Sequence, residues 1–97
     1  MIKFIKGTFV LDEKIESKEE YTKSKKDVMQ EIVAWADFEL GVELGFGYTD
    51  DKQLVCQYRI EGHTQKVCQG LLSELKRMLK KNFPRMKETL QMKGESF

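Results

Sequence analysis

Hydrophobic and polar residues alternate without interruption over residues 38–48, which read FELGVELGFGY. Every even position is apolar, and every odd position is glycine or glutamate. Successive side chains of a strand point to opposite faces, so this pattern predicts one strand with an apolar face. Its other face would carry only glycines and carboxylates.

A second alternating run covers residues 54–61 and predicts the strand that pairs with the first. Both apolar faces lie on the same side of the sheet only if even-numbered residues of one strand pair with even-numbered residues of the other. A three-residue loop over 50–52 gives this pairing. The predicted pairs are Tyr48 with Leu54, Phe46 with Cys56, Leu44 with Tyr58, and Glu43 with Arg59.

The N-terminal residues 2–11 also predict a strand, but the apolar residues of its alternation stand at even positions up to Phe4 and at odd positions from Phe9. An inserted residue near Lys6 and Gly7, in a β-bulge, would restore one apolar face. A two-residue hairpin turn at the same place is the alternative.

Two helices are predicted from apolar residues at helical spacing. The first follows a charged connector over residues 12–21, with Ser24 or the earlier Ser17 as its cap, and ends near Ala36 or Asp37. Trp35 lies to the side of its apolar face. The second begins after Thr64 and ends near residue 82, before Pro84. Residues 85–92 are expected to add one or two helical turns, and residues 93–97 to fray.

The predicted order is therefore strand, helix, strand, strand, helix in a single α+β domain over residues 1–97. A three-stranded antiparallel sheet would carry both helices on its apolar face, giving a two-layer sandwich.

Composition indicates a globular chain, with 40% hydrophobic and 34% charged residues. The net charge of +1 conceals an asymmetry, since residues 1–50 hold 7 basic and 11 acidic side chains and residues 51–97 hold 10 and 5. No apolar run is long enough to span a membrane. Two cysteines without an export signal predict a cytoplasmic protein with free thiols.

Candidate catalytic and metal-ligating residues are few. His63 is the only histidine, and Cys56, His63 and Cys68 stand at spacings of seven and five. Structural zinc sites commonly use paired ligands such as C-x₂-C, which the sequence lacks. Both cysteines fall on predicted core faces, where a thiol is a poor nucleophile. The sequence therefore predicts no enzyme, no metal and no cofactor.

The glycines of residues 41–47 lie within a strand and lack the lysine and spacing of a phosphate-binding loop. They either allow a bend in the strand or let another molecule approach the sheet closely. By elimination, the sequence predicts a small regulatory protein that binds another protein, with a homodimer paired through an exposed edge strand as one form. The candidate partner-binding residues are Trp35, Gly41, Glu43, Gly45, Gly47 and Arg59.

A basic surface on the second helix supports an alternative, a non-specific RNA or single-stranded DNA binder. A solvated helix face is the simpler interpretation of such a charge run. No aromatic pair is expected on an exposed strand to stack bases. The candidate nucleic-acid contacts are Lys66, Lys76, Arg77, Lys80, Lys81, Arg85 and Lys87.

Overall fold

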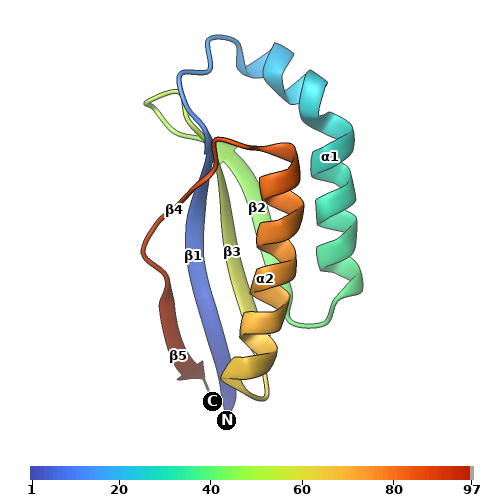
Figure 1. Cartoon of the computed structure of the whole chain (residues 1–97), viewed down its shortest axis with the longest axis vertical. Coiled ribbons are helices and arrows are strands. Elements are labelled where there is room, and N and C mark those ends of the chain that lie inside the picture. The colour runs from blue at the N-terminus through green and yellow to red at the C-terminus, as the bar shows by residue number, and fades with distance from the viewer. Residues whose placement is uncertain (97) are drawn as a thin grey trace.

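The computed structural model describes residues 1–96, which form two helices and five strands (Figure 1). In chain order the elements are β1 (Ile2–Asp12), α1 (Lys18–Phe38), β2 (Val42–Tyr48), β3 (Leu54–Gly62), α2 (Gln65–Asn82), β4 (Lys87–Glu88) and β5 (Met92–Ser96). The class is α+β, as the sequence predicts.

The sheet is antiparallel and has the order β2-β3-β1-β4, with β5 also paired to β1. The two short strands β4 and β5 follow each other along one edge of β1 (Figure 1). The predicted sheet of three strands was therefore too small, because the chain after Pro84 returns to the sheet.

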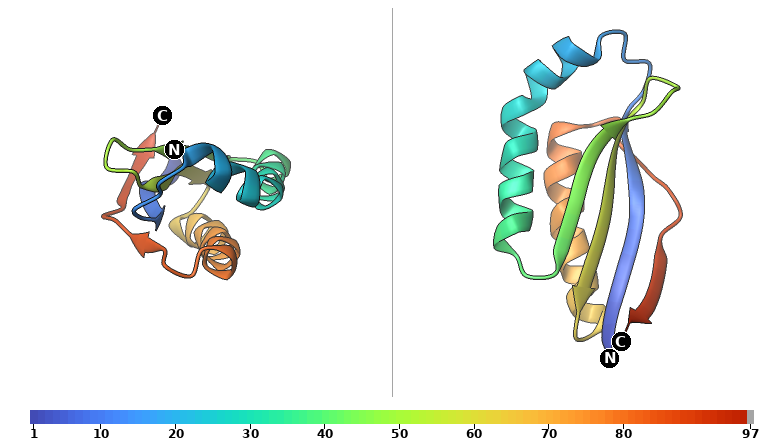
Figure 2. Two further views of the ribbon diagram at one scale, coloured as in Figure 1. Left: turned by 90° about the horizontal axis from the view of Figure 1, so that it is seen from above. Right: turned by 180° about the vertical axis from the view of Figure 1, so that it is seen from behind.

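Both helices pack on the same side of this sheet (Figure 2). α1 lies over β2, and α2 lies over β1 and β3. The core between the layers includes the stacked rings of Phe9 and Tyr58, whose centroids are 5.0 Å apart. The opposite side of the sheet has no helix over it within residues 1–96. Neither described helix has the length and apolar character needed to cross a bilayer.

The hairpin of β2 and β3 has the predicted register, including Glu43 opposite Arg59 and Phe46 opposite Cys56. The predicted first residues of β2 were wrong, because Phe38 ends α1 and Leu40 lies in the connection. Their side chains are 86% and 92% exposed, so neither residue is held in the sheet by burial of its side chain. Gly41 then turns the chain into β2 with φ of +88°.

β1 is one continuous strand, and the predicted irregularity at Lys6 and Gly7 was wrong. Its register shifts between Val10 and Asp12 instead. The helix-facing side chains are Ile5, Phe9 and Leu11, all at odd positions, so no inserted residue is needed. Phe4 belongs to the opposite face.

α1 begins at the earlier of the two predicted caps. Ser17 Oγ accepts a hydrogen bond from the backbone N–H of Glu20, whereas Ser24 lies within the helix. Residues 12–21 are not simply a solvated connector, because Ile15 is buried in the core. α1 buries Ile32 and Ala36 against the sheet.

α2 confirms the predicted cap and end. Thr64 Oγ1 accepts from the N–H of Val67, and the helix ends at Asn82. The prediction of helical turns after Pro84 was wrong, since this segment forms β4 and β5. Residues 92–96 pair with residues 2–6 of β1 rather than fraying. Phe97 lies outside the described residues.

Candidate functional site

The side of the sheet opposite the helices is called the open face. It is formed by even-numbered side chains of β1 and odd-numbered ones of β2 and β3. The pairing aligns these residues in rows across the three strands. One row contains Gly47, Val55 and Val10, and the next contains Gly45, Gln57 and Thr8. Within β1, β2 and β3 neither row carries a charge, and on β4 the first row ends at Lys87, which pairs with Val10.

An exposed sheet face usually bears polar side chains that alternate with the buried ones. Here the two uncharged rows contain glycine, valine and threonine, with Gln57 as the only large polar side chain. These two rows therefore lack the charged side chains that usually cover a solvated sheet face.

Neither a close contact nor a positive φ requires glycine at Gly45 or Gly47. A Cβ added at either position would meet no atom within 4 Å, and neither has a positive φ. The register of β2 also passes through them without a bulge. The predicted role of these glycines in letting the strand bend stays a prediction, because a strand can bend without a change of register.

The other strand and loop glycines differ. A Cβ at Gly7 would lie 2.7 Å from Tyr58 Oη, and one at Gly94 would lie 2.7 Å from Phe4 Cζ. At Gly41 the positive φ and the carbonyl oxygen of Glu61, 2.6 Å from an added Cβ, both exclude a side chain.

Charged residues gather at one end of the open face. Arg59 Nε donates to Glu61 Oε1 at 3.0 Å, and its guanidinium lies 4.2 Å from the ring centroid of Phe4. Glu43 and Lys6 flank Arg59 in the same row. Two cations and two carboxylates therefore balance within this part of the face.

Three shallow hollows follow the open face. One of about 320 Å³, called the glycine hollow, is lined by Gly45 and its neighbours Glu43, Leu44, Gln57, Tyr58 and Arg59. A second, of about 200 Å³, lies at Gly41 and Glu43. The third, of about 350 Å³, lies at the other edge, where Leu90 and Met92 join Lys6, Gly7, Thr8, Gln57 and Tyr58. None of the three is an enclosed cavity of the kind that buries a small molecule.

The structure brings together most of the predicted partner-binding residues. Glu43, Gly45, Gly47 and Arg59 share the open face, and Gly41 lies at its margin. Trp35 is separate, since it belongs to α1 and packs partly buried against the core between the layers. Its indole Nε1 is buried and has no hydrogen-bond partner among the described residues.

Sequence reasoning missed Leu90 and Met92, which it placed inside a helical turn. Their side chains are 97% and 58% exposed beside the open face. The available signal was the short alternation of Leu90 and Met92 with the polar Thr89, Gln91 and Lys93, which is typical of strands.

The predicted nucleic-acid residues are divided between α2 and the segment after it. Four of the seven cations contact carboxylates of the chain itself: Lys76 with Glu88, Arg77 with Glu74, Arg85 with Asp12, and Lys87 with Glu13. Lys66, Lys80 and Lys81 are exposed. A surface hollow of about 400 Å³ between α2 and β4 contains Lys76, Arg77 and Lys80 together with Glu88.

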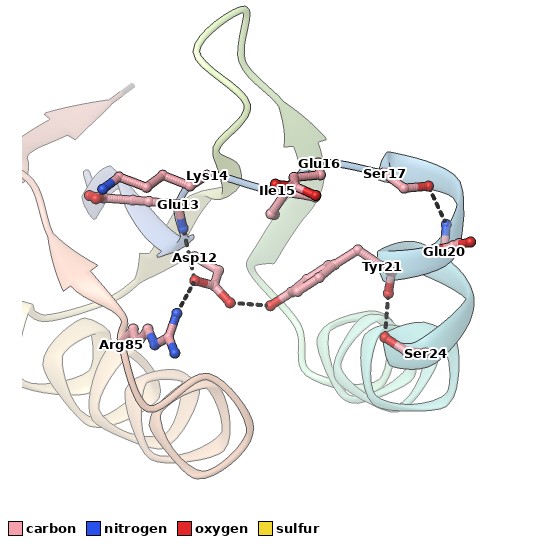
Figure 3. Close-up of a pocket in the computed structure, with 10 residues that line it drawn as sticks. All are labelled: Asp12, Glu13, Lys14, Ile15, Glu16, Ser17, Glu20, Tyr21, Ser24 and Arg85. Atoms are coloured by element: carbon pink, nitrogen blue, oxygen red, sulfur yellow. Dashed lines mark hydrogen bonds and ion pairs between the residues drawn. The ribbon is translucent and has the colours of Figure 1, made fainter.

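A cavity of about 460 Å³ lies where β1 leads into α1 (Figure 3). Tyr21 Oη donates to Asp12 Oδ2 at 2.7 Å, and the backbone N–H of Glu13 donates to Oδ1 at 2.9 Å. Arg85 Nη1 approaches Asp12 Oδ1 at 3.8 Å from the turn after α2. These contacts satisfy Asp12 within the chain, so the cluster holds three segments together rather than presenting a reactive group.

The thiols of Cys56 and Cys68 are buried. Burial raises the pKa of Cys56 to about 12 and also raises the pKa of Cys68. Both remain protonated near neutral pH, which disfavours nucleophilic chemistry. Within the described chain, no three His, Cys, Asp or Glu side chains are grouped to hold a metal ion.

The order β-α-β-β-α-β, with β1 between β3 and β4 and both helices on one side, defines a ferredoxin-like α+β fold. A crystal structure described as that of a chlorite dismutase has a similar fold, with a TM-score of 0.50 and 14% sequence identity. The match covers 95% of this chain and 40% of that one, so this chain spans about two fifths of its length. No protein-family model matches the sequence, and no curated protein matches it significantly. The likeness concerns the fold alone.

Proposed function

We propose that the protein is a small non-enzymatic binding protein whose open face contacts another protein. The supporting observation is the pair Gly45 and Gly47, which expose backbone on a regular strand where a larger side chain would fit. A regulatory role through such contacts, rather than catalysis, is also favoured by the protonated thiols and the internally satisfied Asp12.

The two glycines reduce the stability of the isolated chain. Glycine within a strand costs about 0.5–1 kcal/mol relative to alanine, because it loses more backbone freedom on folding. Neither position gains a close contact or a special backbone angle in return. A partner surface that packs directly on the backbone would supply the missing benefit.

The size of the open face is compatible with a specific interface. Strands about 4.8 Å apart and seven to nine residues long make a face of roughly 20 by 25 Å. Two such faces in contact bury on the order of 1,000 Å², which reaches the lower range of specific protein interfaces.

The basic helix gives the nucleic-acid alternative less support. Intramolecular ion pairs engage four of the seven candidate cations. The one aromatic ring among the paired open-face residues of β1, β2 and β3 is Phe4, and the guanidinium of Arg59 already lies over it, 4.2 Å from its centroid. The experiment below nevertheless separates the two functions.

The test is affinity purification from a lysate of the native host, with nuclease treatment, using three baits. They are the wild-type chain, Gly45→Gln with Gly47→Gln, and Gly70→Gln as a matched control. Gly70 lies on α2, away from the open face, and also has no atom within 4 Å of an added Cβ. We expect the wild type and the control to retain a companion, or endogenous copies of the chain, that the double variant loses.

The companion is then purified and its direct binding to each bait is measured. The proposal fails if the double variant binds as tightly as wild type, or if nuclease-treated wild type recovers no protein at all. Recovery that requires polynucleotide, and that is lost in Lys76→Glu with Lys80→Glu, would favour the nucleic-acid alternative instead.

A further inference from the structure

The open face has a hollow at one edge and a projection at the other. The glycine hollow lies over β2, where Gly45 presents no side chain. Across the sheet, Leu90 projects from the segment between β4 and β5 and is 97% exposed. The open position at Gly45 on one side and the exposed Leu90 on the other make the face complementary to itself at this level, whereas Gly47 is level with Lys87 of β4.

The hollow and the projection also lie at the same level along the strands. Gly45 pairs with Gln57, and Gln57 pairs with Thr8. On the far side of Thr8, the backbone N–H of Thr89 donates to the carbonyl oxygen of Thr8 at 3.2 Å, and Leu90 follows directly. Leu90 and Gly45 are therefore close to opposite ends of one row.

We infer that two copies form a twofold dimer in which Leu90 of each enters the glycine hollow of the other. This inference rests on the proposed function and identifies the partner as a second copy of the chain. An axis between the two sheets and parallel to their strands places β2 of one copy over β4 and β5 of the other. It keeps each residue at its own level, so Leu90 meets Gly45.

The same axis places β3 of one copy over β1 of the other. Val55 then faces Val10 of the second copy, and Gln57 faces Thr8, which are apolar and polar matches respectively. Arg59 faces Lys6, but Glu43 and Glu61 lie beside this pair in both copies and balance its charge. Met92 lies at the level of Lys6 and so meets the second copy near Glu43.

The test is sedimentation velocity on the purified chain up to high micromolar concentration. We expect a wild-type dimer, and Leu90→Glu should raise its dissociation constant about tenfold or more, because it places a carboxylate in the buried hollow. Leu40→Glu is the matched control, since Leu40 is 92% exposed but lies outside the open face. It should leave the dissociation constant unchanged.

A second measurement checks the contact itself. A Gly45→Cys chain mixed with a Leu90→Cys chain should form a covalent heterodimer under mild oxidation, whereas Leu40→Cys in place of Leu90→Cys should not. A monomeric wild type, or a Leu90→Glu dimer as tight as wild type, overturns the inference. The wild type could instead be monomeric and bind a different protein that the glycine variant does not bind. In that case the proposed function survives and only this inference fails.

Discussion

Tyr21 in α1 donates a hydrogen bond of 2.7 Å from its phenol to Asp12 Oδ2 at the end of β1 (Figure 3). The bond connects the first strand to the first helix across the buried Ile15. Because Asp12 also accepts from the N–H of Glu13, the two contacts fix the path of the chain between these elements.

Tyr21→Phe should lower the free energy of unfolding by about 1–2 kcal/mol, since it removes a partly buried hydrogen bond to a carboxylate. Tyr48→Phe is the control, because its hydroxyl bonds Thr22 and the Lys18 carbonyl at the exposed surface. Its effect should be smaller. Urea unfolding of the three proteins gives both values, and equal losses would contradict a special role for Asp12.

The same phenol predicts how stability responds to alkaline pH. Burial, followed by the hydrogen bond to Asp12 and its charge, raises the pKa of Tyr21 well above the ordinary 10.0. The unfolded chain therefore releases this proton at lower pH than the folded chain. The stabilisation is complete below about pH 10 and is lost as the pH rises above it.

We expect the free energy of unfolding to fall more steeply above about pH 10 in wild type than in Tyr21→Phe, which lacks the group. Denaturant unfolding at several pH values measures both slopes. Parallel slopes in the two proteins would show that Tyr21 does not titrate with folding.

The thiols give a third prediction. With a pKa of about 12 against the ordinary 9.0, Cys56 has about a thousandfold less thiolate at neutral pH than a free cysteine. Native protein should therefore react slowly with iodoacetamide at both cysteines, and guanidinium-unfolded protein should react at the rate of a free thiol. Mass spectrometry of each cysteine over time separates the two sites. Rapid labelling of either cysteine in native protein would contradict this prediction and indicate an accessible, reactive thiolate.

Local periodicity was enough to predict the hairpin of β2 and β3 and the limits of α2. The hairpin was predictable because burial on one face allows only one parity of pairing, and Glu43 opposite Arg59 follows from it. Thr64 and Pro84 bounded α2 through backbone chemistry that acts within a few residues.

The remaining elements depend on contacts between distant segments. β4 and β5 are short strands, and only the free edge of β1, some eighty residues earlier, gives them a partner. Phe38 and Leu40 were predicted in a strand because they continue the alternation of residues 42–48. The structure leaves both side chains exposed, so they do not belong to the sheet. The open face could be predicted on β2 and β3 from local alternation. Leu90 and Met92 at its other edge could not, because their position depends on pairing with the distant β1.

Three glycines that look equivalent in the sequence of residues 41–47 should respond oppositely to alanine. Gly41→Ala should cost several kcal/mol, because φ is +88° and the new Cβ would lie 2.6 Å from the backbone oxygen of Glu61. Gly45→Ala and Gly47→Ala should each raise the stability of the dilute, monomeric chain by up to about 1 kcal/mol, since both sites are open.

The measurement is denaturant unfolding at low protein concentration, with partner binding determined in parallel. If the open face is a binding surface, Gly45→Ala with Gly47→Ala should gain monomer stability and lose affinity for the partner, because the added methyl groups keep the partner away from the backbone. A double variant that loses stability would mean that these glycines serve the strand itself, and the argument for the open face would lose its principal support.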